Sequence, residues 1–146
     1  MQFVCDAPGG TWFRFETEGE AILESQLMKH SVEKYFKQAA DEAAKSFVPP
    51  PTMRAFEQKI GLKAHVQKAM PLFLTLRDNE GNGLATAMLP PGAKESKSFK
   101  PIIVGPNNTD PYPKNTAAIA ALGRHYGLAL EAGRCVPSWA GRSSVR

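Results

Sequence analysis

The sequence predicts an α+β domain in which an antiparallel sheet packs on helices in two layers, and three observations predict it. Residues 17–47 contain no Gly or Pro after Gly19 and repeat apolar residues at helical spacing. Residues 3–15 and 72–89 each place turn residues between β-prone runs, which is the pattern of a hairpin. A further helical pattern begins near residue 115. We therefore expect two hairpins and one short strand packed on a long N-terminal helix and a C-terminal helix.

The opening hairpin joins residues 3–5 to residues 11–15 through the turn-forming residues 6–10. Side chains alternate between the two faces of a strand, so Phe13 and Phe15 share one face. We expect that face to lie on the long helix.

The long helix, residues 17–47, should turn one apolar stripe toward the sheet. Acidic residues near its start and lysines near its end suit the helix dipole. At 1.5 Å per residue it would extend about 43 Å, beyond the roughly 30 Å span of a domain of this size. The predicted core stripe consists of Ile22, Leu23, Leu27, Val32, Tyr35, Phe36, Ala39, Ala43 and Phe47.

Residues 48–51, Val-Pro-Pro-Pro, cannot continue the helix because proline lacks the backbone N–H and restricts the residue before it. Thr52 is then expected to cap a second helix that extends to about residue 70, and Gly61 is a point at which this helix can divide. The basic residues of this stretch scatter around the helix, which favours ordinary solvation over a nucleic-acid groove. They are Arg54, Lys59, Lys63 and Lys68.

The second hairpin places the turn residues 78–83 between residues 72–77 and 84–89. Alternation puts three leucines on the core side of its first strand and Phe73 on the other side. An apolar Phe73 needs a cover on that second face, from another element or from another chain. Residues 102–104 add a short apolar strand after a polar loop.

The last helix carries small residues beside its apolar stripe. Each glycine inside a helix costs about 1 kcal/mol relative to alanine, so a close backbone approach should compensate. The candidates for that approach are the alanine-rich end of the long helix, residues 39–44, and a symmetry mate. The apolar stripe consists of Ile119, Leu122, Tyr126 and Leu130, and the small strip of Ala120, Gly123 and Gly127.

Cysteine and histidine usage indicates neither a disulfide framework nor a metal site. We expect Cys5 and Cys135 to be free thiols, with a bridge between the two ends of the domain as the alternative. His30, His65 and His125 fall on three different predicted helices, and none has a second ligand at metal-binding spacing. No metal and no cofactor are therefore predicted.

If the chain is an enzyme, its site is expected at residues 105–116, where a strand and a glycine-containing loop lead into the last helix. A helix N-terminus can hold an anion, but three prolines remove donors here and favour a structural loop. The candidate catalytic residues are Asp110 as the base, Tyr112 and His125, with Lys114 or Arg124 holding an anionic group of the substrate.

Charge is distributed unevenly within the net +4 of the chain. Residues 1–47 hold five basic and eight acidic side chains, net −3, and residues 48–146 hold thirteen and six, net +7. This asymmetry suits an acidic protein, a nucleic acid or a second copy of the chain. The candidate binding residues are the loop lysines Lys94, Lys97 and Lys100, which exposed loops also carry for solubility alone, together with Lys114 and Arg124.

The 146 residues, 42% hydrophobic and 22% charged, suit one domain, which we place at residues 1–133, followed by a basic tail at 134–146. No run approaches the roughly 18 apolar residues of a membrane span, and no signal peptide is recognisable, so we expect a cytoplasmic protein that does not contact the membrane. The function we expect is that of a non-enzymatic interaction or regulatory module that acts through protein–protein contacts as a homodimer. The alternatives are a nucleic-acid-associated protein that uses the basic residues of 48–146, and a small enzyme with its site at residues 105–116.

Overall fold

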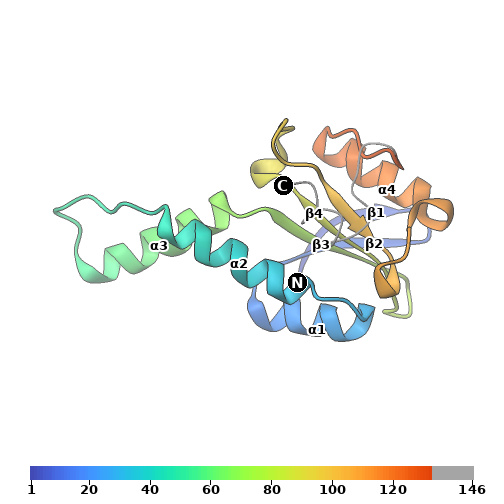
Figure 1. Cartoon of the computed structure of the whole chain (residues 1–146), viewed down its shortest axis with the longest axis horizontal. Coiled ribbons are helices and arrows are strands. Elements are labelled where there is room, and N and C mark those ends of the chain that lie inside the picture. The colour runs from blue at the N-terminus through green and yellow to red at the C-terminus, as the bar shows by residue number, and fades with distance from the viewer. Residues whose placement is uncertain (133–146) are drawn as a thin grey trace.

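The computed structural model of the chain describes residues 1–132 (Figure 1). The predicted tail, residues 134–146, and with it Cys135, lies outside the described residues. The elements are β1 Gln2–Ala7, β2 Gly10–Phe15, α1 Glu18–Met28, α2 Val32–Lys45, α3 Ala55–Ala69, β3 Leu72–Arg77, β4 Gly83–Leu89, β5 Ile102–Val104 and α4 Tyr112–Tyr126, with 3-10 turns at Pro91–Ala93 and Pro106–Asn108.

The five strands form one antiparallel sheet in the order β1-β2-β3-β4-β5, so the predicted α+β class is confirmed. Each strand pairs with the next along the chain: β1–β2 and β3–β4 are hairpins, while the three helices α1, α2 and α3 connect β2 to its neighbour β3. None of the helices in residues 1–132 combines the length and the apolar character needed to cross a membrane.

The expected two layers are in fact three, because helices cover both faces of the sheet (Figure 1). Strands β3 and β4 are apolar on both sides, and each side needs its own cover. Helix α4 packs on the face that carries Leu74, Leu76 and Trp12. The Trp12 indole N–H donates a hydrogen bond of 2.9 Å to the Ala118 carbonyl of α4, which satisfies the indole inside this core.

Helices α1 and α2 cover the opposite face of the sheet. The Phe36 ring of α2 lies between Phe15 and Phe73, with ring centroids 6.1 and 5.0 Å away. Phe15 therefore faces the N-terminal helices as predicted, and Phe73 is covered by its own chain. Val32 and Ala43 are buried with Phe36, so this part of the predicted stripe is confirmed, while Tyr35, Ala39 and Phe47 are half-buried.

The predicted continuous helix over residues 17–47 is wrong, because it consists of two helices. Lys29 adopts a left-handed conformation, φ 54°, and its N–H donates back to the Ser25 carbonyl, which ends α1. His30 then turns into the core, and α2 begins at Val32. Residues of the predicted apolar stripe recur at helical spacing on both sides of this turn, although those of α1 are exposed and those of α2 are buried or half-buried, so periodicity alone could not locate the break.

The predicted core face of α1 is also wrong. Helix α1 buries Ala21, Glu24, Ser25 and Met28. The apolar residues that were expected inside lie outside, with Ile22 36%, Leu23 64% and Leu27 44% exposed. The reason is a polar anchor on the inner side, described below.

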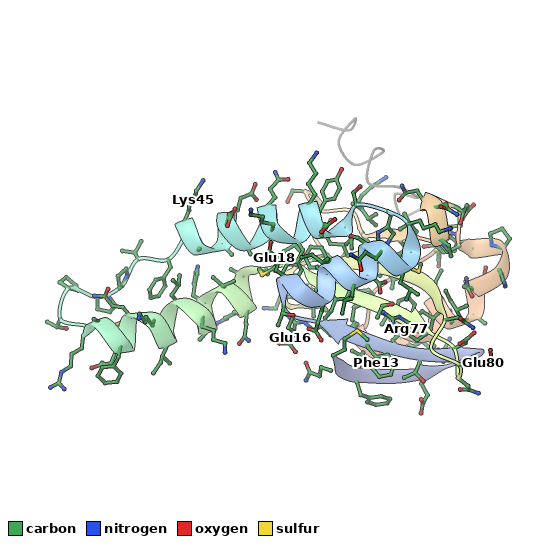
Figure 2. The ribbon with its side chains drawn as sticks, turned by 90° about the horizontal axis from the view of Figure 1, so that it is seen from below. Phe13, Glu16, Glu18, Lys45, Arg77 and Glu80 are labelled. Atoms are coloured by element: carbon green, nitrogen blue, oxygen red, sulfur yellow. The ribbon has the colours of Figure 1, made fainter. Side chains whose placement is uncertain are left out.

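Helix α3 and the distal end of α2 form an arm that extends away from the sheet (Figures 1 and 2). The helix begins at Ala55 with Arg54 as its N-cap residue, so the predicted cap at Thr52 is wrong. Gly61 does not divide it. A Cβ at Gly61 would lie 3.2 Å from the Phe47 ring, so this glycine allows α3 to pack closely against the end of α2.

The close approach predicted at Gly123 exists, but neither the alanines of α2 nor a second chain supply it, and α2 lies on the other face of the sheet. A Cβ at Gly123 would lie 2.7 Å from the carbonyl oxygen of Leu128. The chain turns back there: Gly127, φ 71°, ends α4, and the Leu128 N–H donates to the Gly123 carbonyl over 2.8 Å.

Candidate interaction surface

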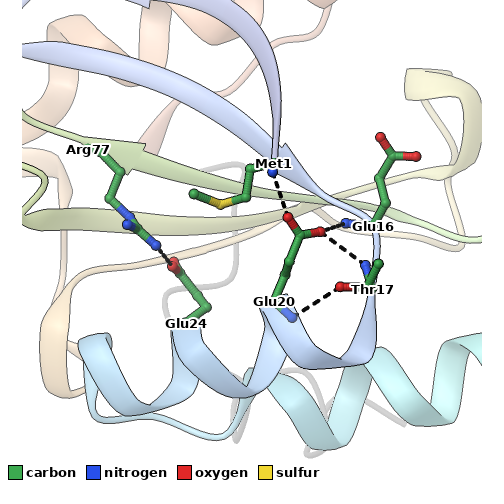
Figure 3. A network of polar contacts seen from close by, with 6 residues as sticks. All are labelled: Met1, Glu16, Thr17, Glu20, Glu24 and Arg77. Carbon is green, nitrogen blue, oxygen red and sulfur yellow. Dashed lines mark hydrogen bonds and ion pairs between the residues drawn. The ribbon is translucent and has the colours of Figure 1, made fainter.

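The orientation of α1 is determined by one buried carboxylate. The Glu24 side chain is 1% exposed, and its Oε1 lies 2.8 Å from Nη2 of Arg77 on β3 (Figure 3). Its other oxygen accepts a hydrogen bond from the Thr86 hydroxyl on β4. A buried carboxylate deprived of these partners would carry a large desolvation cost. Glu24 therefore keeps this side of α1 on the sheet.

His30 extends the same cluster at the turn between α1 and α2. Its Nδ1 accepts from the Val32 N–H over 3.4 Å, so Nε2 carries the proton and donates to the Thr86 hydroxyl over 2.9 Å. The Thr86 hydroxyl then donates its own hydrogen to the Glu24 carboxylate, so each hydrogen in this series of contacts has one acceptor. Burial lowers the pKa of His30 below 6.5, while the Glu24 carboxylate opposes the shift.

A second anchor secures the start of α1. The Thr17 hydroxyl accepts from the Glu20 N–H over 3.1 Å, and the Glu20 carboxylate accepts from the N–H groups of Thr17 and Glu16, which makes a capping box (Figure 3). The amino group of Met1 adds an ion pair of 2.6 Å to Glu20. With both ends held, α1 cannot rotate to hide its apolar side.

The outward side of α1 is therefore an exposed apolar surface, which we call the α1 face: Ile22, Leu23, Gln26 and Leu27. These positions recur at helical spacing and lie on one side of the helix. Exposed apolar side chains that gather on one fixed element, rather than being scattered singly, are typical of protein interfaces.

The arm carries a second exposed apolar surface, which we call the α3 face: Phe56, Ile60 and Lys63. Phe56 is 59% and Ile60 66% exposed, and no residue of α3 is buried. The inner side of α3 rests on α2, where His65 lies against the Phe47 ring and within 2.7 Å of the Ser46 hydroxyl. The arm therefore has its own internal contact, and its outer side faces solvent.

The candidate catalytic residues are not brought together. Asp110 and Tyr112 lie at the start of α4, and His125 lies near its end, thirteen residues after Tyr112, which at 1.5 Å per residue puts about 20 Å between them. The Asp110 carboxylate instead accepts from the Tyr112 N–H over 3.0 Å, a local turn contact that starts the helix. His125 is exposed beside the ring of Tyr126.

The candidate binding residues are all exposed and fall into separate places. Lys97 and Lys100 line an open cleft of about 580 Å³ together with Phe99, Leu128 and Glu95. Lys94 precedes them in the same loop, while Lys114 and Arg124 lie on α4. A smaller cleft of about 320 Å³ lies between α2 and this loop, and the Phe99 ring borders both.

Among the residues that the structure describes, neither a metal site nor a reactive thiol is favoured. Within residues 1–132, no three His, Cys, Asp or Glu side chains are arranged so that they could hold a metal ion. Cys5 on β1 is half-buried, and burial together with the neighbouring Asp6 raises the pKa of its thiol, which disfavours the reactive thiolate.

Comparison with known proteins gives no independent guide to the site: no family model, curated protein or solved structure matches the chain.

Sequence reasoning missed both apolar faces. It assigned Ile22, Leu23 and Leu27 to the core because they form the most apolar stripe of their helix. One signal was available, since Ala21, Ser25 and Met28 also recur at helical spacing around Glu24. Choosing that stripe requires knowing that Arg77 and Thr86 lie opposite Glu24, which only the folded sheet provides.

Proposed function

We propose that this chain is a non-enzymatic interaction module that binds a protein partner through the α1 face and the α3 face. The observation that carries the proposal is the exposure of large apolar side chains on a helix that two polar anchors hold in place. Helix surfaces of this kind bind partners through apolar residues at positions i, i+3, i+4 and i+7. The proposal includes a cytoplasmic location, where the thiol of Cys5 stays reduced.

Charge supports a protein rather than a nucleic acid as the partner of the α1 face. Helix α1 carries three acidic residues and no basic one, which disfavours contact with phosphates. Within residues 1–132, the cleft lined by Lys97, Lys100 and Phe99 favours the alternative, since lysines beside an aromatic ring suit single-stranded nucleic acid. Retention on single-stranded DNA that weakens steeply with salt, and that Lys97→Glu abolishes, would support this second function.

Photo-crosslinking tests the protein-binding proposal. A photoreactive phenylalanine analogue replaces Phe56 or Leu23 in cells that express the chain, and Glu80, exposed in the turn between β3 and β4, serves as the control position (Figure 2). We expect protein adducts from positions 56 and 23 and none from position 80. When a chain that carries the photoreactive analogue at position 56 also carries Ile60→Glu, the protein adducts should disappear. Labelled chains without any protein adduct, or with nucleic acid alone, would refute the proposal.

A further inference from the structure

We infer that the partner is a second copy of this chain, and that the α3 face of each copy packs on the α1 face of the other. This inference rests on the proposed function and names its partner. It covers both exposed apolar surfaces with one kind of contact, made twice across a two-fold axis. A contact of α1 with α1 alone would leave Phe56 and Ile60 in water.

The two helices carry opposite charge. Helix α1 has Glu18, Glu20 and Glu24 and no basic residue. Helix α3 has three lysines, at positions 59, 63 and 68, against the single acidic residue Glu57. Glu20 and Glu24 are engaged inside their own chain, while Glu18 is exposed beside the α1 face. A partner with apolar side chains flanked by lysines therefore complements α1.

The spacing of the two faces matches when the helices run antiparallel. Both faces repeat every three or four residues, so aligning Ile60 with Ile22 and Leu23 places Phe56 at Gln26 and Leu27. The same alignment brings Lys63 level with Gly19 and Glu20, about 1.5 to 3 Å along the helix axis from Glu18, an offset that the lysine side chain can span. Arg54 would then approach Lys29, but Arg54 already pairs with Glu57 across 3.9 Å.

A two-fold axis produces this antiparallel alignment. Glu18, which starts α1, lies at the end of α1 that is nearer the tip of the arm, and Lys45, which ends α2, likewise lies at the arm end of α2 (Figure 2). Helices α1 and α2 therefore run in opposite directions, and α3, which returns along α2, runs in the direction of α1 (Figures 1 and 2). A two-fold rotation perpendicular to that direction reverses the second copy, so its α3 runs antiparallel to the α1 of the first. The arm projects beyond the sheet, where it can reach a neighbour.

The inference is tested by exchanging the charges of Glu18 and Lys63 and measuring dimerisation of the full chain by sedimentation equilibrium. We expect a dimer of twice the 15.9 kDa chain mass that dissociates on dilution. Glu18→Lys and Lys63→Glu should each weaken the dimer about tenfold, since each change converts two ion pairs into two repulsions. The double variant should return to within about twofold of the original. Lys97→Glu, with the same change of charge away from both faces, should leave the dimer unchanged.

Isotope mixing identifies the contact itself. Chains carrying the photoreactive analogue at position 56 are mixed with isotope-labelled chains, and the adduct is expected on the labelled tryptic peptide of residues 15–29, which contains the α1 face.

A monomeric mass at every concentration, or a double variant that dimerises no better than either single variant, overturns the inference. If position 56 then crosslinks to a different protein in cells, the proposed function stands and only the self-contact fails. Absence of any protein adduct would refute both.

Discussion

Glu24 is the residue on which the orientation of α1 depends. It is a charged side chain at an almost fully buried position, and it is paired with Arg77 and Thr86 of the sheet. Burying such a pair is not in itself stabilising, because desolvation offsets much of the Coulomb attraction. Its effect is on specificity, since only one rotation of α1 gives the carboxylate its partners.

Replacing Glu24 by alanine should lower the free energy of unfolding by about 3 kcal/mol, because Arg77 and Thr86 lose a buried partner. Urea denaturation measures the change. Glu18→Ala, at an exposed position of the same helix, serves as the control, and at concentrations where the chain is dissociated it should change the value by less than about 0.5 kcal/mol. Equal stabilities of the two variants would contradict the anchoring role of Glu24.

The stability of the protein should depend on pH through His30. Burial holds its folded-state pKa below 6.5, so the unfolded chain binds more protons in that range. The contribution is fully present above pH 6.5 and is lost as pH falls from 6.5 toward the lower folded pKa. Urea midpoints measured between about pH 7.5 and 5.5 should decline less in His30→Gln than in the original chain. An unchanged slope would mean that His30 does not titrate differently in the two states.

The pair α1 and α2 behaves as one covering layer made of two unlike helices. Helix α2 buries an apolar side and exposes charge, while α1 buries its polar anchor and exposes apolar residues. The stability of the monomer should therefore depend on α2, and assembly should depend on α1.

Phe36→Ala should destabilise the fold by about 3 to 5 kcal/mol, because the ring fills the space between Phe15 and Phe73. The matched change on α1, Leu23→Ala, should cost less than about 1 kcal/mol in the dissociated chain, since this side chain is already in water. Chemical denaturation at low concentration compares the two. A large loss in Leu23→Ala would place that residue in the core after all.

Gly123→Ala should destabilise the protein by about 1 to 3 kcal/mol, because the added Cβ would meet the Leu128 carbonyl and not a flexible side chain. The neighbouring Arg124→Ala, at an exposed position, is the control. Thermal melting should separate the two variants, and size-exclusion chromatography should show no change of assembly for either. A melting temperature equal to that of the original chain would show that the backbone at Leu128 can shift to accommodate the added Cβ without loss of stability.

At the scale of the whole molecule, the protein is a three-layer body with an arm. The body contains two apolar cores, one on each face of the sheet, whereas α3 contains no buried residue. Local stability follows burial, so the arm should open at a much lower free energy than the sheet.

Hydrogen exchange measures this difference. At concentrations where the chain is dissociated, the amides of α3 should exchange much faster than those of β3, because β3 is buried between two helical layers. Raising the concentration should slow exchange in α3 and in α1 but not in the turn at residues 78–82. Equal protection of α3 and β3 in the dissociated chain would indicate that the arm is covered by its own chain.

Several parts of this protein were determined by local sequence. The hairpins followed from turn residues between β-prone runs, the end of α2 from the prolines at 49–51, and the buried position of Phe36 from its spacing. These features depend on neighbours along the chain, so the sequence carries their signal directly. The close approach at Gly123 was also visible, because a glycine inside a helix needs a compensating contact.

Only the tertiary structure decided which side of α1 faces the sheet, where the long helical pattern breaks, and that helices cover both faces. Each depends on contacts between residues far apart in sequence, above all Glu24 with Arg77 and His30 with Thr86. Periodicity records that a helix has an apolar side but not what lies opposite it. In α1 the buried ion pair, and not the apolar stripe, determines which side of the helix faces the sheet. The stripe is therefore exposed, and it forms the surface on which the proposed contact depends.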